Sequence, residues 1–588
     1  MKLVRYETSY LHSASIRSAV HDEAFFNAAQ GNVDSAAELE ATLQAFALPN
    51  EGDPNQHAQC RFPARFIWLG KYLDFDRLGI KAVACPNYYK WTLNNTVESI
   101  SLIYATGYLG NPASYYGHVL LKLNSAKEKN HTKLLDVSVN YGAIVPNNEN
   151  PFVYMVKGLL GGYDGGFSHV NYYFHNHNYG ENELRDLWEY ELELSSDEVE
   201  LVLAHAWELL GKPYTYYFFR KNCAFRIGEV LEIIEGINII PSNPVFTLPQ
   251  TLIQNAGDGM RNGKPLVSRV SYHPSRQARL YNNFGVLDQI EKKAVYTVAA
   301  EFGDLNSDEY SALPLESKQQ VLDTLLDYYQ FAKVAESLPE NNIETSYQGI
   351  LSERYALPPG RRGTVERIPE SPGSGRRASL IQLGAVHNER YGDGVSVSLR
   401  PAYYDALDSG ARQVKNSALS MGEVKLRMYD GDLKIRSLDV IKIESVHSSS
   451  TNLEGDRSKA WKLRLGLSQK NLSCTNCLSA RFEGDIGQTL ALHPKVLVGA
   501  YVGGGVQDNR LGSGNLFVKT SAFSHMYINN SLGMRLLAEL PAQIDGSGGG
   551  ENYFSVEARQ QISEGIDLRF LYEKKGVAEY SLSLGYYF

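Results

Sequence analysis

The sequence predicts an α+β domain with a helical lead-in, followed by an all-β antiparallel transmembrane barrel of about 12 strands. Residues 379–588 fall into alternating polar and apolar segments of about ten residues separated by turn residues, the repeated signature of such a barrel. The N-terminal half instead mixes helical periodicity with short apolar runs that indicate buried strands. Residues 357–378, rich in Pro, Gly and Arg, form a linker between the two regions.

With 588 residues, 43% of them hydrophobic, the chain has room for two to four domains. We expect a helical lead-in, an α+β domain, a helical extension, the linker and the barrel. Their expected bounds are 1–93, 94–245, 246–356, 357–378 and 379–588.

Charge and hydropathy restrict the class of protein. The net charge of −9 argues against a nucleic-acid binder, so no nucleic-acid partner is expected. No apolar run reaches the roughly 18 residues of a transmembrane helix. The 38 tyrosines, against 22 phenylalanines, suit side chains with one apolar and one wet end.

The five cysteines indicate an oxidising compartment. Cys60 and Cys85 flank one short region and are expected to pair, and Cys474 and Cys477 to close a turn. A CxxC pair is also compatible with zinc or thiol redox chemistry, but a second ligand pair is missing, which favours a loop disulfide. Cys223 would then be the single free thiol.

Cys223 lies where a helix is expected to begin. Ile227, Val230 and Leu231 recur at helical spacing, and Asn222 is a suitable N-cap. Free N–H groups and the helix dipole at that position favour a thiolate, so Cys223 is a candidate nucleophile. The alternative is a buried structural cysteine.

His118 is the candidate proton carrier for this thiol. Gly117 and His118 precede a short apolar run, which predicts a loop entering a buried strand. A further strand over residues 135–142 places Asp136 and Asn140 on one face. We expect Asn140 to orient the imidazole, with Asp136 as the alternative and ordinary surface polarity as the simpler explanation.

Two other stretches have weaker signals. Gly158 to Gly166 lacks the lysine of a phosphate loop and is expected to form a hairpin or a lid. His175 and His177 form an HxH pair, expected on a strand, near His169, but no carboxylate motif accompanies them. We therefore expect neither a metal nor another cofactor.

The clearest alternation of a barrel strand is found in the C-terminal segment. Tyr580, Leu582, Leu584, Tyr586 and Phe588 share one face and small polar residues share the other. This ending resembles the assembly signal of bacterial outer-membrane proteins; the alternative is a soluble β-sandwich or barrel.

In a membrane, the ring must close, and the strand ending at Phe588 should pair with the first strand near residues 379–386. Leu568, Leu582 and Leu584 should then point outward, with Tyr572, Tyr580 and Tyr586 in belts.

The first residues, Met1 to Thr8, are not followed by the apolar core of a signal peptide. Since the rest of the chain favours an envelope location, we expect the true start to lie upstream.

Several motifs together resemble the Lnb-type N-terminal periplasmic domain family, whose namesake is a bacterial lipoprotein N-acyltransferase. Over about residues 95–240 they are Asn111 to His118, Val139 to Gly142, Lys157 to Tyr163, Arg185 to Tyr190 and Asn222-Cys223. The lead-in with Phe62 to Arg65 is also similar to that of proteobacterial members. The resemblance implies a permuted papain-like Cys-His site with Cys223 and His118.

These observations predict an outer-membrane-anchored periplasmic cysteine acyltransferase or hydrolase that acts on a lipid, lipoprotein or other envelope substrate. Membrane helices follow the domain in the namesake, so the barrel found here leaves the lipoprotein substrate open. The alternatives are a peptidoglycan amidase or peptidase, and a barrel-anchored scaffold or transport component without catalysis.

Overall fold

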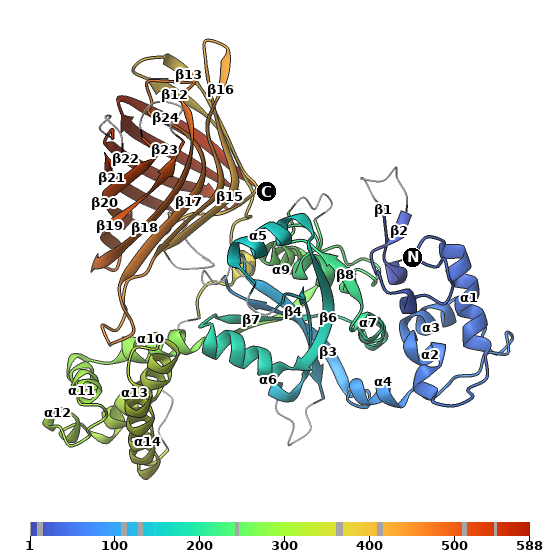
Figure 1. The fold of residues 1–588 in the computed structure, drawn as a ribbon. Helices are drawn as coiled ribbons and strands as arrows, with labels where there is room; N and C mark the ends of the chain where they lie inside the picture. Colours follow the sequence, from blue (N-terminus) through green and yellow to red (C-terminus); the bar gives the residue numbers. More distant parts are fainter. Residues whose placement is uncertain are drawn as a thin grey trace. The chain divides into compact units, whose positions relative to one another are not determined.

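The computed structural model describes residues 2–8, 16–107, 115–126, 133–146, 149–241, 246–359, 368–407, 416–508, 514–545 and 550–588. The chain forms two compact units, Met1–Ser275 and Arg276–Phe588. Figure 1 shows an α+β arrangement in the first unit, and helices and a barrel in the second. The motif residues 111–114 lie outside the described part.

The first unit is built on a seven-stranded sheet in which every neighbouring pair is antiparallel. Its order is β11-β7-β3-β4-β5-β6-β8. The strands are β3 (Val97–Ala105), β4 (His118–Ser125), β5 (Val137–Ala143), β6 (Tyr163–Asn171), β7 (Leu187–Leu192), β8 (Pro213–Tyr216) and β11 (Val267–His273). A small separate pair joins β9 (Met260–Arg261) to β10 (Lys264–Pro265).

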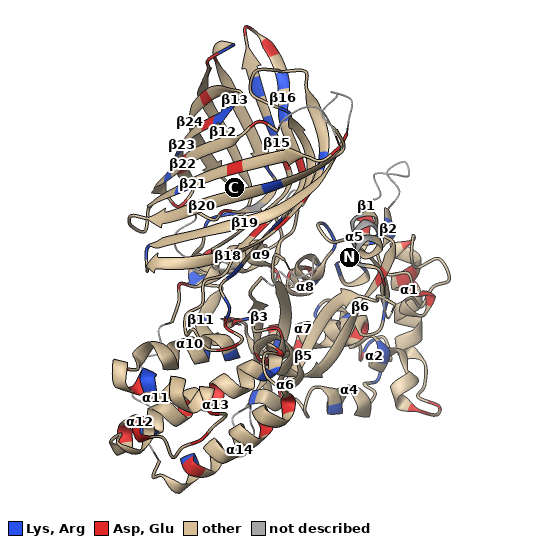
Figure 2. Cartoon of the chain, turned by 60° about the vertical axis from the view of Figure 1, so that its left-hand side comes forward, with Lys and Arg blue, Asp and Glu red and all other residues tan. Residues whose placement is uncertain are grey.

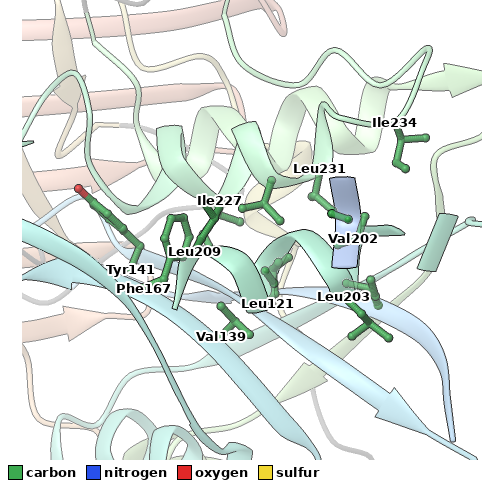
Figure 3. Packing of buried hydrophobic residues seen from close by; sticks show 14 of the residues in the cluster. Leu121, Val139, Tyr141, Phe167, Val202, Leu203, Leu209, Ile227, Leu231 and Ile234 are labelled. Carbon is green, nitrogen blue, oxygen red and sulfur yellow. The ribbon is translucent and has the colours of Figure 1, made fainter. Parts of the chain in front are cut away.

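Helices cover one face of this sheet. α8 (Cys223–Leu231) packs on β4 and β5, and α7 (Ser196–Leu209) packs on β3 and β6. Figure 3 shows the shared core, in which Leu121 and Val139 of the sheet meet Ile227 and Leu231 of α8. Two more helices complete this region, α5 (Pro151–Leu160) and α9 (Pro249–Asp258).

The lead-in is less helical than expected. The lead-in was expected to be helical, whereas α1 spans only Ser35–Ala47 and two antiparallel strands, β1 (Tyr6–Thr8) and β2 (Ile16–Ser18), precede it. Backbone pairing therefore overrides the local helical pattern there. The remaining helices are α2 (Ala58–Arg61), α3 (Pro63–Gly70) and α4 (Pro86–Trp91).

A buried ion-pair network joins the lead-in to the sheet domain. The Arg65 guanidinium lies 2.7 Å from the Glu38 carboxylate and 3.7 Å from that of Glu208 on α7. The Cys60–Cys85 disulfide closes the lead-in, as predicted, and Cys474–Cys477 closes the turn. Lead-in and sheet domain thus form one unit.

Three expectations about local structure were wrong. Within the range 246–356, expected to be helical, Val267–His273 forms the strand β11, which pairs with β7 and completes the sheet. The glycine-rich stretch forms no hairpin: Gly158 lies in the last turn of α5, which ends at Leu160, and Gly165 lies in β6. His175 and His177 lie on α6 (Tyr172–His175) and the following π-helical turn η6 (Asn176–Asn182), not on a strand.

The second unit begins with a helical region. Its helices are α10 (Arg276–Val286), α11 (Gln289–Ala300), α12 (Asp308–Ser311), α13 (Leu315–Val334) and α14 (Glu340–Ala356). Tyr281 of α10 donates a 2.6 Å hydrogen bond to Asp456, in the loop that follows β16. Among the described residues, no helix combines the length and apolar composition needed to cross a bilayer.

The described barrel residues form a sheet of thirteen strands. One of them, the short β14, pairs only with β15 and lies outside the ring, which therefore has twelve strands. β24 pairs with β12, and β13 with β15, so the ring closes. The strands are β12 (Leu380–Asn388), β13 (Gly392–Arg400), β14 (Ala402–Tyr404), β15 (Ser417–Tyr429), β16 (Asp432–Val446), β17 (Lys459–Gln469), β18 (Leu478–His493), β19 (Val496–Gln507), β20 (Leu516–Tyr527), β21 (Leu532–Gln543), β22 (Tyr553–Ser563), β23 (Ile566–Lys575) and β24 (Val577–Tyr587).

The ring is apolar outside and polar inside. Leu582 and Leu584 are 51% and 53% exposed, while Asp567 and Arg569 face inward and are buried. Figure 2 shows acidic and basic residues of both signs on the barrel strands. A soluble barrel would have the reverse arrangement, so this ring is built to span a membrane.

The end of the chain confirms the predicted closure. Phe588 donates its backbone N–H to the Ser379 carbonyl, beside the ladder of β24 and β12. Tyr572 and Tyr580 lie directly opposite each other on β23 and β24, and Tyr586 lies six residues farther along β24. These tyrosines therefore occupy two levels of the outer wall, as belts require.

Candidate active site

Cys223 is the first residue of α8, as predicted. Asn222 caps the helix: its side chain accepts from the Phe225 N–H and donates to the carbonyls of Phe218 and Thr247. The cap fixes the helix start, and the Cys223 side chain is 5% exposed. Of the five cysteines, all within the described residues, Cys223 has the free thiol.

His118 is the first residue of β4 and is held by Asn140 of β5. The imidazole Nε2 lies 2.6 Å from the Asn140 Oδ1. The paired residues of these strands run from Leu121 to Leu123, so this bond joins β4 to β5 just beyond their ladder. An amide oxygen can only accept a hydrogen bond, so Nε2 has the proton and Nδ1 of the neutral ring is free to accept one.

The thiol and the imidazole share neighbours at this end of the sheet. The backbone N–H of Val119, the residue after His118, acts on the Cys223 thiol and lowers its pKa. The Tyr179 ring packs 5.8 Å from the His118 ring, and its hydroxyl lies in the electrostatic field of Cys223. Arg185 acts electrostatically on both groups.

Burial sets both protonation states. It lowers the pKa of His118 to about 4, although the hydrogen bond to Asn140 partly opposes this. It raises the pKa of the Cys223 thiol to about 11, although the N–H groups of Val119 and Ala224 and the charge of Arg185 act in the other direction. At neutral pH the resting site therefore holds a thiol and a neutral imidazole rather than an ion pair.

Asn140, rather than Asp136, contacts His118, as expected. Asp136 instead accepts a 2.5 Å hydrogen bond from the Ser125 hydroxyl and lies 3.8 Å from the Lys122 ammonium. Because Asp136 is engaged in this buried polar network, it does not orient the His118 imidazole.

Residues of the α6–η6 segment were missed as neighbours of the site. The His175 and Tyr179 rings stack at 5.6 Å, which places a second imidazole behind the tyrosine that covers His118. Arg185 donates to the carbonyls of Ala105 and Thr106 at the end of β3. Arg185 belongs to the Arg185 to Tyr190 motif of the family resemblance, which is the sequence signal nearest to this segment.

No metal site is evident in the part of the chain that the structure describes: no group of three or more His, Cys, Asp or Glu side chains is placed to hold an ion. His169 lies on β6, and its ring contacts Trp91 at 6.1 Å. His175 and His177 lie on neighbouring turns and face aromatic rings, Tyr179 and Tyr173.

Comparison with protein families now identifies the first unit. Residues 87–254 match the family described as the Lnb N-terminal periplasmic domain. The chain contains an Lnb-type domain. Two families described as domains of unknown function match residues 1–72 and 369–587, which correspond to the lead-in and the barrel. The molecule thus joins an Lnb-type periplasmic domain to an outer-membrane barrel.

Solved structures similar to the chain are outer-membrane barrels. They include the KdgM porin (7% identity, TM-score 0.23, covering 36% of this chain and 99% of that one) and Omp33 of Acinetobacter baumannii (8%, 0.21, 36% and 99%). OmpT of Vibrio cholerae with a loop deletion matches at 11% identity and a TM-score of 0.19, covering 36% and 97%. At these scores the likeness has no weight, and the membrane assignment rests on the barrel's own geometry. No curated protein matches the chain.

Proposed function

We propose that the protein is an outer-membrane-anchored cysteine acyltransferase or hydrolase of the periplasm. Cys223 is the nucleophile, His118 the proton carrier and Asn140 the residue that orients His118. The substrate is an ester, thioester or amide of a lipid or lipoprotein. The observation that supports the proposal is the His118 Nε2–Asn140 Oδ1 bond, which leaves Nδ1 free to act as a base in the domain that also holds the free thiol of Cys223.

The first half-reaction follows from the neutral resting pair. As the Cys223 sulfur attacks the substrate carbonyl, its proton passes to His118 Nδ1. The N–H groups at the start of α8 stabilise the negative oxygen that develops. Collapse of the tetrahedral intermediate breaks the bond to the leaving group, which takes the proton from His118, and a thioester remains on Cys223.

The second half-reaction decides between transfer and hydrolysis. His118 removes a proton from the incoming amine, alcohol or water, which attacks the thioester and restores the thiol. Water gives hydrolysis and an amine gives N-acylation. The barrel keeps the domain on the membrane, so a lipid-linked substrate or acceptor meets it at a raised effective concentration.

A thiol-directed acyl probe tests the proposal on the full-length protein in outer-membrane vesicles. We expect mass spectrometry to locate the adduct on Cys223, and Cys223→Ala to abolish it while the heat-modifiable mobility of the barrel is kept. Labelling at Cys474 or Cys477 but never at Cys223 would remove the catalytic hypothesis.

Substrate class is tested by comparing cells that carry the wild-type and Cys223→Ala proteins. Lipidomics should show a changed acyl-lipid or lipoprotein pool if the acyl-transfer proposal holds. A change confined to muropeptides would replace it with cell-wall hydrolysis, and full complementation by Cys223→Ala would leave a non-catalytic role.

A further inference from the structure

A short segment of the chain folds into the barrel lumen. Directly after β14, Asp405, Ala406 and Leu407 turn inward, and we call these three residues the plug segment. Ala406 and Leu407 are only 2% and 1% exposed. The Leu407 N–H donates to the Asp405 carboxylate, which makes the turn compact.

The plug segment is bound to the wall opposite its origin. β14 pairs with β15, whereas the partners of the plug segment lie on β20, β22 and β23. Arg569 lies 2.5 Å from the Asp405 carboxylate. Tyr527 donates a 2.7 Å hydrogen bond to the Ala406 carbonyl, and Arg559 donates to that of Leu407. The segment therefore crosses the lumen.

These contacts place the plug segment at one end of the barrel. Tyr527 is the last residue of β20, and Gly533, whose nearest neighbour is Leu407, is the second residue of β21. The same end holds the start of β12 and the end of β24. It is thus the end at which the chain enters and leaves the barrel.

Ion pairs also join opposite walls of the lumen. Glu444 on β16 lies 2.6 Å from Arg535 on β21 and accepts a 3.0 Å hydrogen bond from Tyr501 on β19. Arg436 on β16 lies 3.7 Å from Glu573 on β23. β16 is separated from β21 and from β23 by four other ring strands, so these bonds span the lumen.

Aromatic rings fill further space at the level of Tyr501. Its ring stacks on that of Phe523 at 4.9 Å, inside the barrel. Gly499 makes room for this layer, because a Cβ there would lie 2.5 Å from the Phe523 ring. Between the described residues the lumen keeps a cavity of about 280 Å³ lined by charged side chains of both signs, from Asp405 to Arg436 and Glu573.

We propose that this barrel is a sealed anchor and not a diffusion channel. The plug segment and the Glu444–Arg535 pair close the end that holds both barrel termini, and the Arg436–Glu573 pair crosses the lumen nearer the other end. Buried charges of this kind are stable because each is paired, and separating a pair leaves an uncompensated charge. The ring therefore holds the Lnb-type domain on the membrane without opening a path for solutes.

Cross-linking tests the position of the plug segment. A Cβ built on Gly533 lies 3.5 Å from the Leu407 Cβ, which is within disulfide range. We expect Leu407→Cys/Gly533→Cys, in a Cys223→Ala background, to form a disulfide with copper phenanthroline in the folded full-length protein.

Leu407→Cys/Gly565→Cys is the matched control, because the nearest atom to a Cβ on Gly565 is the Tyr587 carbonyl oxygen. A folded, heat-modifiable barrel in which the first pair fails to cross-link, or in which both pairs cross-link equally, overturns the placement.

Conductance tests the seal. In planar bilayers and in liposome-swelling assays, the full-length protein should give no stable pores, whereas Asp405→Ala/Leu407→Ala/Glu444→Ala should raise sugar permeability at least tenfold. Stable unit conductance of the wild-type protein overturns the proposal, as does a folded triple variant as impermeable as the wild type. If the triple variant does not fold, the wild-type conductance and the cross-link decide.

Discussion

Strands of the Lnb-type sheet and of the barrel wall both place successive side chains on opposite faces, but Val119 and Leu121 lie in a core whereas Leu582 and Leu584 are exposed. In β4, Val119 and Leu121 are buried against the helices. In β24, Leu582 and Leu584 point outward, and Ser581 and Glu579 point into the lumen. One strand pattern thus serves an aqueous fold in the first case and a lipid-embedded fold in the second.

The two regions treat buried charge alike. Lys122, beneath the candidate site, lies 3.1 Å from Glu189, and Lys519 in the lumen lies 2.5 Å from Glu483. Burying a charge without a partner costs free energy in the domain interior and in the barrel lumen alike. Both regions therefore pair their buried charges, although their apolar side chains point in opposite directions. The medium determines where apolar side chains go, whereas charge pairing follows burial alone.

The largest expected effect separates chemistry from anchoring. Cys223→Ala should lower kcat/KM at least about 10³-fold, because it removes the attacking atom, and His118→Ala about 10²- to 10⁴-fold. Asn140→Ala should lose less, since the imidazole remains. Single-turnover kinetics on the first acyl substrate identified measures this, with the barrel's mobility as the folding control. Equal activity of Cys223→Ala and wild type would contradict the assignment of Cys223 as the nucleophile.

A charge on the lipid-facing wall should come next. Leu582→Arg, near the middle of β24, should destabilise the barrel by up to about 4 kcal/mol, because arginine must enter hydrocarbon. Leu582→Met is the matched control. Urea unfolding in lipid vesicles gives both values, and an unchanged midpoint for the arginine variant would place this wall outside the bilayer.

The two disulfides offer a sharper contrast, one in each unit. Cys60 and Cys85 are separated by 25 positions, and Cys474 and Cys477 by three. Replacing the first pair with serine should cost roughly 3 kcal/mol of loop entropy, and replacing the second much less. Denaturant titrations of the two double variants give the order, and a larger loss for the short loop would contradict it.

The smallest effect is a displaced pH profile. A histidine of ordinary pKa loses its basic, neutral form below about pH 6.5. His118 has a pKa of about 4 and therefore stays neutral down to about pH 4. The acidic limb of kcat/KM should therefore lie near pH 4, with activity falling as His118 becomes protonated. Circular dichroism at each pH separates this from unfolding. A limb near 6.5 would mean that the imidazole is hydrated.

Much of this architecture could be predicted because its signals are local. Asn222 predicted the start of α8, and alternation at Tyr580 to Phe588 predicted both the last strand and its outward face. The sequence alone did not decide whether Asn140 or Asp136 lies beside His118. The answer depends on where the pairing of β4 and β5 ends.

What could not be predicted depends on long-range pairing. β11 looked like part of a helical region, and only its partner β7 makes it a strand. Tyr179 reaches His118 through a π-helical turn that has no distinct composition. The cross-lumen pairs join residues about a hundred or more positions apart, such as Arg436 and Glu573, and depend on ring closure.

The burial of Cys223 also affects the fate of its sulfur in an oxidising envelope. Disulfide exchange and oxidation require a thiolate that can be reached by another molecule. With a pKa of about 11 and little exposure, the Cys223 sulfur of the folded domain is slow to react with other thiols and with oxidants. Once the domain has folded, the free thiol of this chain is thereby protected from exchange with the Cys60–Cys85 and Cys474–Cys477 disulfides.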